Sequence, residues 1–326
     1  MSERRIPFKG LLLKVYGVYA IRKTKLKIGL YHLRRSLKYC YNTSTRNGWV
    51  AAMRTRCHVI EKGLTMPDIR YGFGQPRILD IVEMLNDNRN YENEGVYKYT
   101  VGLLKEYLDF HDRNGKILPN AFRKTIEELT SRYPDVKAEQ QIDITSEEYY
   151  SNIDSAFPFF CRSRRTVRYF EKPAPIADVQ EAVELAGYAP SACNRQSIKC
   201  HYFEGEIVKK ILSIQKGNKG FGHLAPQLFI LTSDVSMMTP YEYNDSFTNA
   251  GIFAMNLSYA LYYKQIASCI LTWSVLPEDD LALREIADIP KVETIVLLII
   301  FGKTPREFRI AKSKRQQVNE FLIMHI

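Results

Sequence analysis

The sequence predicts two structurally different parts, a mostly helical N-terminal region followed by a region in which helices alternate with short strands. In residues 11–40, apolar side chains recur at spacings of three, four or seven with basic residues between them, which is typical of an amphipathic helix. From about residue 155, apolar runs of strand length alternate with helical segments. One run, 294–302, is apolar on both faces and is therefore predicted to be a buried central strand.

The N-terminal region is predicted to hold several helices and to end in a linker. The pattern of 11–40 is expected to break around Gly29, and further helices are predicted at 47–63, 76–87, 95–113 and 119–132. The polar stretch 133–148 is typical of a linker. We therefore expect a helical basic region at 1–140 and a second domain at 155–326.

The second domain is predicted to contain three strands and four helices. The strands are expected at 199–203, 228–232 and 294–302, and the helices at 176–187, 206–214, 247–265 and 277–287. The helix at 247–265 is apolar nearly all round, so it is predicted to lie in the core or in a subunit interface.

Positive charge is concentrated at one end of the chain. The net charge is +10 over 326 residues, but residues 1–60 carry 14 Lys and Arg against one acid, and the remainder carries 32 bases and 35 acids. Three partners fit this basic arm: an anionic membrane surface, nucleic acid, or the acidic surface of the protein's own dimer. Nucleic acid ranks last because no RNA- or DNA-binding motif accompanies the bases.

Several classes of protein are disfavoured by what the sequence lacks. The six cysteines form neither a C-x-x-C pair nor a Cys/His grouping, so a zinc site and a disulfide framework are not expected. The first apolar run, 11–21, resembles neither a signal peptide nor a membrane-spanning helix. We therefore expect a cytoplasmic protein, with peripheral attachment to the inner face of the membrane as an option for the arm. No dinucleotide-binding, P-loop or hydrolase motif occurs.

Three local patterns carry chemistry. The first is Arg-Arg-Thr-Val-Arg at 164–168, a dense set of cationic donors suited to a phosphate or to a charge that develops on a ligand. The second is Tyr-Ala-Pro-Ser-Ala-Cys-Asn-Arg-Gln at 188–196, a tight loop of small and amide residues after a predicted helix. The third is Lys-Ser-Lys-Arg at 312–315, which follows the predicted central strand. Taken singly, each is also compatible with a solvated surface or a capped turn.

In this order and spacing, the three patterns and the long apolar helix resemble the FMN-dependent nitroreductase family over about residues 158–326. The resemblance implies an α+β fold, with a mainly antiparallel sheet flanked by helices and preceded here by a mostly helical region. It also implies a homodimer with flavin at the subunit interface. NADH or NADPH is the implied electron donor, and a small organic molecule is the substrate.

The resemblance assigns cofactor-binding roles residue by residue. Arg164, Arg165, Thr166 and Arg168 match the segment that grips the phosphate and ribityl chain and places a cation near the flavin ring. The loop that meets the flavin of the partner subunit is matched by Ser191, Asn194 and Gln196. Lys314 and Arg315 match a phosphate clamp, and Asn218 matches an amide at the ring edge. No catalytic side chain is named, because the flavin carries the redox chemistry.

One departure from the family concerns the pocket. The chain reads Gln-Ile-Ala-Ser-Cys at 265–269, where many members have Gly-Leu-Gly-Ser, so side chains there are expected to narrow the pocket. This departure keeps open a different class of function, a flavin-binding or membrane-surface adaptor with little turnover. Thr166 in place of the usual serine keeps the hydroxyl.

The N-terminal region offers a second candidate site. His58 and Glu61 are three residues apart on a predicted helix, close enough to pair. One interpretation is a structural pair beside a turn. The other is that this segment caps the flavin cleft and contributes Arg56, His58 or Glu61 to an anionic substrate. Similar extended nitroreductase-like proteins are associated with surface-polysaccharide genes, so the resemblance also implies a sugar- or polysaccharide-linked acceptor.

Overall fold

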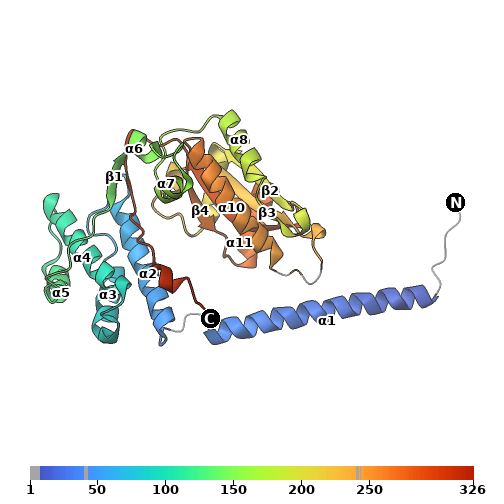
Figure 1. Ribbon diagram of the computed structural model, residues 1–326, viewed down its shortest axis with the longest axis horizontal. Helices are drawn as coiled ribbons and strands as arrows, with labels where there is room; N and C mark the ends of the chain where they lie inside the picture. Colours follow the sequence, from blue (N-terminus) through green and yellow to red (C-terminus); the bar gives the residue numbers. More distant parts are fainter. Residues whose placement is uncertain (1–7, 40–42, 240–241, 243) are drawn as a thin grey trace.

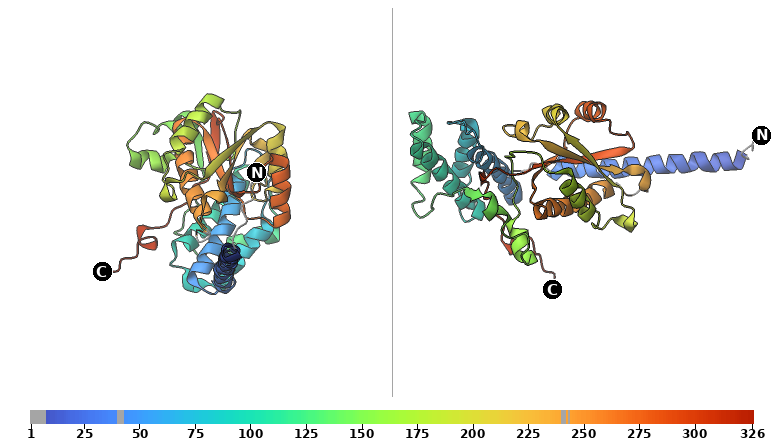
Figure 2. Two further views of the ribbon diagram at one scale, coloured as in Figure 1. Left: turned by 90° about the vertical axis from the view of Figure 1, so that its right-hand side faces the viewer. Right: turned by 90° about the horizontal axis from the view of Figure 1, so that it is seen from above.

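The computed structural model describes residues 8–39, 43–239, 242 and 244–326. Figure 1 shows a lobe of helices beside a sheet-containing domain, with one long helix that extends away from the lobe. The right view of Figure 2 shows the same arrangement, with the N-terminal end of that helix farthest from the other N-terminal helices.

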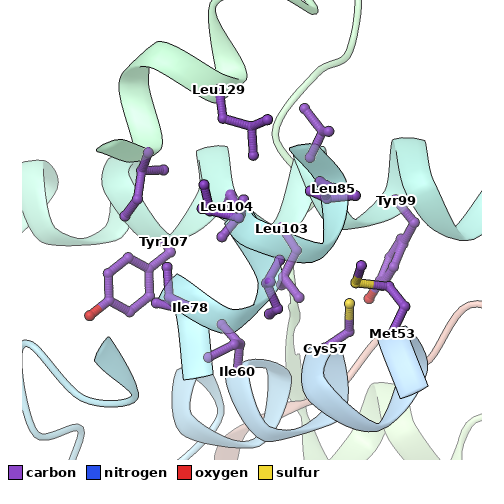
Figure 3. Packing of buried hydrophobic residues seen from close by; sticks show 14 of the residues in the cluster. Met53, Cys57, Ile60, Ile78, Leu85, Tyr99, Leu103, Leu104, Tyr107 and Leu129 are labelled. Atoms are coloured by element: carbon purple, nitrogen blue, oxygen red, sulfur yellow. The ribbon is translucent and has the colours of Figure 1, made fainter. Parts of the chain in front are cut away.

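Four helices pack together in the N-terminal lobe. They are α2 (Arg46–Leu64), α3 (Gln75–Asp87), α4 (Gly95–Arg113) and α5 (Asn120–Thr130), with a 3-10 turn at Arg89–Tyr91. Their apolar faces meet in one core, in which Met53, Ile60, Ile78 and Leu104 are fully buried (Figure 3). The four helices predicted for this region are thus confirmed, with ends that differ by at most two residues.

The first helix, α1 (Phe8–Tyr39), runs without interruption through Gly29, so the predicted break is wrong. A single glycine inside a helix costs only about 1 kcal/mol relative to alanine, too little to end a helix of 32 residues. Leu26, Leu30, Leu33 and Leu37 form an exposed apolar row at spacings of three and four.

A four-stranded antiparallel sheet forms the centre of the second domain. Its strands are β2 (Ile198–Glu204), β3 (Gln227–Asp234), β5 (Glu293–Gly302) and β4 (Ala267–Thr272), in that spatial order. The predicted central strand is therefore confirmed, since β5 pairs with both β3 and β4. The α+β fold with a mainly antiparallel sheet is also confirmed.

Helices cover both faces of this sheet. Alternate residues of β3 and β5 point to opposite faces, because side chains alternate along a strand. Phe229 and Phe301 pack with α8 (Ile176–Ala186) and α10 (Asp245–Tyr263), whereas Leu228 and Ile300 pack with α9 (Glu206–Ile214) and α11 (Pro277–Ala287). One face of α10 is buried against the sheet, as its apolar pattern predicts.

The predicted linker contains a strand that sequence analysis missed. Within 133–148, β1 (Ile142–Thr145) pairs antiparallel with β6 (Glu307–Ile310), and α6 (Ser146–Tyr150) starts at a capping box of Thr145 and Glu148. Four-residue strands leave no readable periodicity. The pairing returns the C-terminal segment to the helical lobe.

The remaining short elements are α7 (Phe157–Ser163) and 3-10 turns at Ala192–Asn194, Gly222–Leu224, Val235–Met237 and Val318–Glu320.

Gly302 sets how closely the segment after the Arg-rich motif approaches the sheet. Lys303 N donates to Lys172 O at 2.9 Å, and Glu171 N donates to Lys303 O at 2.9 Å. A Cβ at Gly302 would lie 3.0 Å from Lys172 O and 2.8 Å from Cγ of Pro226. The absence of a side chain is therefore required for this close approach.

We predict that Gly302→Ala lowers the free energy of unfolding by about 1–3 kcal/mol, because it overpacks the end of the central strand. Urea denaturation followed by circular dichroism measures this. The control is Gly95→Ala, since a Cβ there meets nothing within 4 Å and the change should be within about 0.5 kcal/mol. Equal stability of Gly302→Ala and the wild type would show that Lys172 and Pro226 can move away from residue 302 without cost.

Candidate functional site

A cavity of about 450 Å³ lies between the helical lobe and the second domain. Its walls come from α2, the start of α4, residues 165–168 and the segment after β6. The volume is in the range of about 300–1,000 Å³ that small-molecule sites occupy. The cavity therefore joins the two candidate sites that the sequence predicted separately.

The Arg-rich segment forms one wall. Val167 is buried and its N–H donates to Ser268 O at 3.1 Å, which ties the segment to the edge strand β4. Arg165, Thr166 and Arg168 line the cavity, whereas Arg164 is not among its lining residues. The guanidinium of Arg168 lies over the ring of Phe221, 5.6 Å from its centroid, and its buried Nε has no hydrogen-bond partner.

The segment after β6 brings further positive charge. Lys314 and Arg315 both line the cavity. The segment is anchored by Lys312, whose Nζ lies 2.5 Å from a carboxylate oxygen of Glu139 and whose carbonyl accepts from Arg165 Nη1 at 3.1 Å. The two predicted phosphate-binding segments are therefore brought together by the fold.

Positive charge in this cavity is incompletely neutralised. The pKa of Arg165 is lowered, first by burial and then by the charges of Arg315 and Arg164. Among the described residues, neither Arg165, Arg168 nor Arg315 has a carboxylate within 4.0 Å in an ion pair. Such a donor set is suited to a ligand that carries negative charge.

The wall from α2 holds the predicted His–Glu pair. Nδ1 of His58 lies 3.6 Å from a carboxylate oxygen of Glu61, so the two side chains do pair. Glu61 is buried and also accepts a hydrogen bond from the Tyr99 hydroxyl. Burial and the charge of Glu61 raise the pKa of Tyr99, so this hydroxyl remains a donor. Arg56 is not among the residues that line the cavity, and its Nε lies 4.0 Å from Asp80.

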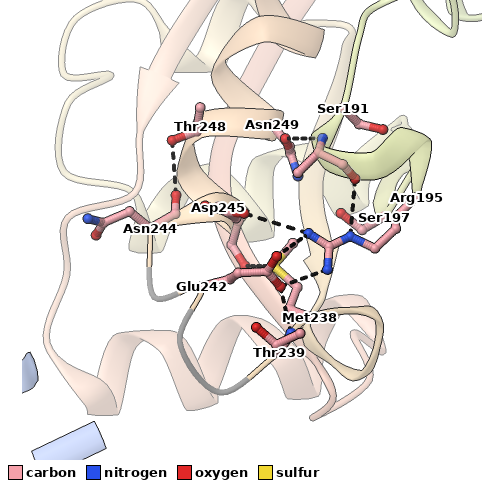
Figure 4. Close-up of polar contacts among 12 residues, drawn as sticks. Ser191, Arg195, Ser197, Met238, Thr239, Glu242, Asn244, Asp245, Thr248 and Asn249 are labelled. Carbon is pink, nitrogen blue, oxygen red and sulfur yellow. Dashed lines mark hydrogen bonds and ion pairs between the residues drawn. The ribbon is translucent and has the colours of Figure 1, made fainter. Parts of the chain in front are cut away.

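The predicted amide loop lies elsewhere in this chain. Ser191, Asn194 and Gln196 follow α8 and bond to one another, with Gln196 N donating to Ser191 Oγ at 3.0 Å and Gln196 Nε2 donating to Asn194 Oδ1 at 3.1 Å. Figure 4 shows the neighbouring Arg195, which makes two hydrogen bonds of 2.7 Å to Glu242. The loop is expected to meet the flavin of a partner subunit, and that expectation stays a prediction.

Asn218 holds its own turn. Its Nδ2 donates to Leu212 O at 2.8 Å and to Gln215 O at 2.5 Å, and it is not among the residues that line the cavity. The turn nevertheless positions Phe221, whose ring lies below the guanidinium of Arg168. The predicted ring-edge role of the amide stays a prediction.

The segment 265–269 does not narrow this cavity. Gln265 has φ 54° at the turn before β4, and Cys269 is buried in that strand. None of the five residues is among those that line the cavity. The departure from the family pattern therefore lies in the packing behind the Arg-rich wall.

Sequence analysis missed one cluster at the cavity edge. Arg46 bonds both carboxylate oxygens of Glu94, at 2.5 and 2.6 Å, and both of Glu320, at 3.2 and 2.7 Å. These bonds raise the pKa of Arg46 and lower the pKa of Glu320. The contact of Glu320 had no signal in the sequence, since it depends on the β1–β6 pairing. The position of Arg54 at the site could have been predicted, because it lies four residues before His58 and therefore on the same side of a predicted helix.

Comparison with known proteins bears on residues 161–303, which match the model of the nitroreductase family. This part of the chain is therefore similar to the nitroreductase family, and the match does not extend to the helical lobe. A comparison with curated proteins finds no match.

Solved structures give weaker likenesses. A nitroreductase family protein of Streptococcus pneumoniae is 22% identical, with 52% of this chain and 100% of that chain covered and a TM-score of 0.46. An FMN-dependent nitroreductase of Clostridium difficile is 17% identical, with 46% and 89% covered and a TM-score of 0.41. The family assignment therefore rests on the match at 161–303.

Among the described helices, none combines the length and the hydropathy that a membrane-spanning segment needs.

We predict that Arg46→Met loosens the C-terminal segment, because Arg46 joins Glu320 to the start of α4. Hydrogen exchange of the amides at 316–320 should become faster, while that of β1 should not change. The matched control is Lys216→Met, which removes an exposed ion pair of 2.6 Å with Asp279 outside the cavity. Unchanged exchange at 316–320 would show that the cluster does not hold the segment.

Proposed function

We propose that the cavity binds FMN and that the protein is an FMN-dependent oxidoreductase. One observation carries the proposal: Arg165, Thr166 and Arg168 face the same cavity as Lys314 and Arg315, although the two segments are far apart in the sequence. The buried Nε of Arg168 lacks a partner, and no described carboxylate pairs with Arg165 or Arg315. The residues present therefore fit a cofactor that carries a phosphate.

The residues take the roles that the family resemblance implies. Lys314 and Arg315 would hold the phosphate, and Arg165 and Thr166 would contact the chain that joins it to the ring system. Bound FMN would supply two-electron redox chemistry. Arg168 is the cation assigned to the ring, where it would stabilise the negative charge that reduction leaves. Electron donor and organic acceptor would occupy the cleft in turn, with NADH or NADPH as donor.

We also propose a homodimer with the flavins at its interface. Ile252, Met255 and Tyr259 lie on one side of α10, and the exposed ring of Phe157 packs on Tyr259, 6.1 Å between centroids. The C-terminal residues 321–324 expose four further apolar side chains. A partner subunit would cover such a surface. Ser191, Asn194 and Gln196 would then meet the partner's cofactor, and the sugar-linked acceptor stays a prediction.

We predict that purified protein loaded with FMN is yellow and is bleached by NADH or NADPH. Arg315→Gln should raise the Kd for FMN at least about tenfold, because a charge-assisted contact to the phosphate is lost. It should change the Kd for riboflavin, which lacks the phosphate, by less than about twofold. Fluorescence titration measures both constants.

The control for this titration is Arg306→Gln, which removes an exposed arginine outside the cavity and should leave both constants unchanged. Protein that stays colourless and takes up no FMN would contradict the proposed function. An equal loss of FMN and riboflavin affinity would contradict the role of Arg315 in binding the phosphate.

A second function is favoured for α1, which we propose binds an anionic membrane surface. Leu26, Leu30, Leu33 and Leu37 are all at least 40% exposed and form one row along the helix. The helix has no Asp or Glu and has many Lys and Arg. A second copy of α1 would bring like charges together, whereas anionic headgroups complement them.

We predict that the protein co-sediments at low salt with vesicles that contain phosphatidylglycerol and not with pure phosphatidylcholine vesicles. Leu26→Asp with Leu33→Asp should abolish sedimentation, because both the apolar row and the net charge are affected. The matched control is Leu276→Asp with Leu281→Asp, two exposed leucines outside α1. Absence of wild-type sedimentation with anionic vesicles would contradict this role for the arm.

A further inference from the structure

One row of side chains on α2 faces the cavity. Val50, Arg54, His58 and Glu61 line it and are spaced four, four and three residues apart, so they lie on one side of the helix. This helix lies outside residues 161–303, the part of the chain that matches the nitroreductase model. The wall is therefore an addition to the family domain.

Arg54 is the cation of this wall that has no acidic partner. Within the described ranges, no carboxylate lies within 4.0 Å of it in an ion pair, and its buried Nε has no hydrogen-bond partner. The pKa of Glu320 is lowered first by its hydrogen bond to Arg46, and the charge of Arg54 is a smaller cause. Glu61, the other acid of this wall, is bonded to Tyr99 and paired with His58. Arg54 therefore remains available to a ligand.

The cofactor proposed above does not require Arg54. A phosphate monoester carries a charge of about −1.5 to −2 near pH 7. The bases assigned to FMN are Arg165, Arg168, Lys314 and Arg315, and of these only Lys314 has a described carboxylate within 4.0 Å, that of Glu139. Their charge exceeds that of the phosphate, and they come from the second domain and the segment after β6. Arg54 adds a further positive charge from the helical lobe. The cavity thus has a cation left over for a second anion.

We propose that Arg54, with His58 beside it, binds a carboxylate or phosphate of the organic acceptor, so the substrate class is anionic. This inference rests on the proposed FMN-dependent function. Glu61 is buried and accepts a hydrogen bond from Tyr99, and its carboxylate lies 3.6 Å from Nδ1 of His58. His58 is four residues from Arg54, so the two side chains present donors on the same side of α2. The helical lobe thus selects the substrate, and the second domain with the segment after β6 holds the cofactor.

The test compares two isosteric probes, 4-nitrobenzoate and neutral 4-nitrobenzamide, by calorimetry on oxidised FMN-loaded protein with no reductant present. Arg54→Gln should raise the Kd for 4-nitrobenzoate about tenfold, equivalent to one lost charge-assisted contact. The Kd values for 4-nitrobenzamide and FMN should change by less than about twofold. Arg54→Lys, which keeps the charge, should retain part of the preference for the anion. Replacing 4-nitrobenzoate by 4-nitrophenyl phosphate shows which anion is preferred.

The matched control is Arg56→Gln, which removes the same charge from the same helix outside the cavity and should leave all three constants unchanged. Equal affinities of wild type and Arg54→Gln for 4-nitrobenzoate would overturn the inference. So would a loss of FMN affinity as large as that of Arg315→Gln, which would place Arg54 in the cofactor clamp. Wild-type protein that takes up no FMN refutes the proposed function instead, and the two probes are then compared on the protein as purified.

Discussion

The antiparallel pairing of β1 with β6 is the constraint on which the candidate site depends. Four residue pairs, from Ile142 with Ile310 to Thr145 with Glu307, return the C-terminal segment to the helical lobe. Gln141 extends the junction, because it donates twice to the buried carboxylate of Glu106, at 2.9 and 2.8 Å, and accepts from Lys312 N at 2.9 Å. Without this junction, Lys314 and Arg315 would have no fixed position opposite α2.

The cavity gathers like charges at a cost to the folded state. Burial is the first cause of the lowered pKa of Arg165, and repulsion from the nearby charges of Arg315 and Arg164 adds to it. The surrounding structure resists this repulsion through neutral contacts, such as the bond from Arg165 to Lys312 O and the ring of Phe221 below Arg168. A bound anion relieves the repulsion, so ligand binding and stability are coupled. Arginines without acidic partners oppose the stability of the folded protein, and such groups in natural proteins indicate a functional site.

Most of the fold could be predicted from the sequence, because the long elements have clear periodicity. The four lobe helices and the central strand carry 3.6-residue or apolar patterns that tertiary packing did not change. The short strands β1 and β6 carried no such signal, so the segment around residue 142 was interpreted as a linker. The break expected at Gly29 overestimated the effect of a single glycine, since α1 also continues through Gly10 and Gly17.

The candidate site was predicted in pieces. The Arg-rich segment and Lys314 and Arg315 were identified from their residue types and spacing, and His58 with Glu61 from their helical spacing. That these pieces share one cavity follows only from long-range pairing, which no local pattern encodes. The same limit applies to Arg46, whose contact with Glu320 joins opposite ends of the chain.

The strand order of the sheet also sets when the protein can be completed during synthesis. Both β3 and β4 pair with β5, which follows them in the sequence. On the ribosome the helical lobe has its whole core available early, whereas β3 and β4 have unpaired edges until β5 is made after them. Contacts between residues distant in sequence form slowly. Unpaired strand edges are exposed to aggregation during that interval, and the ligand cavity needs residues 311–320, which follow every strand of the sheet.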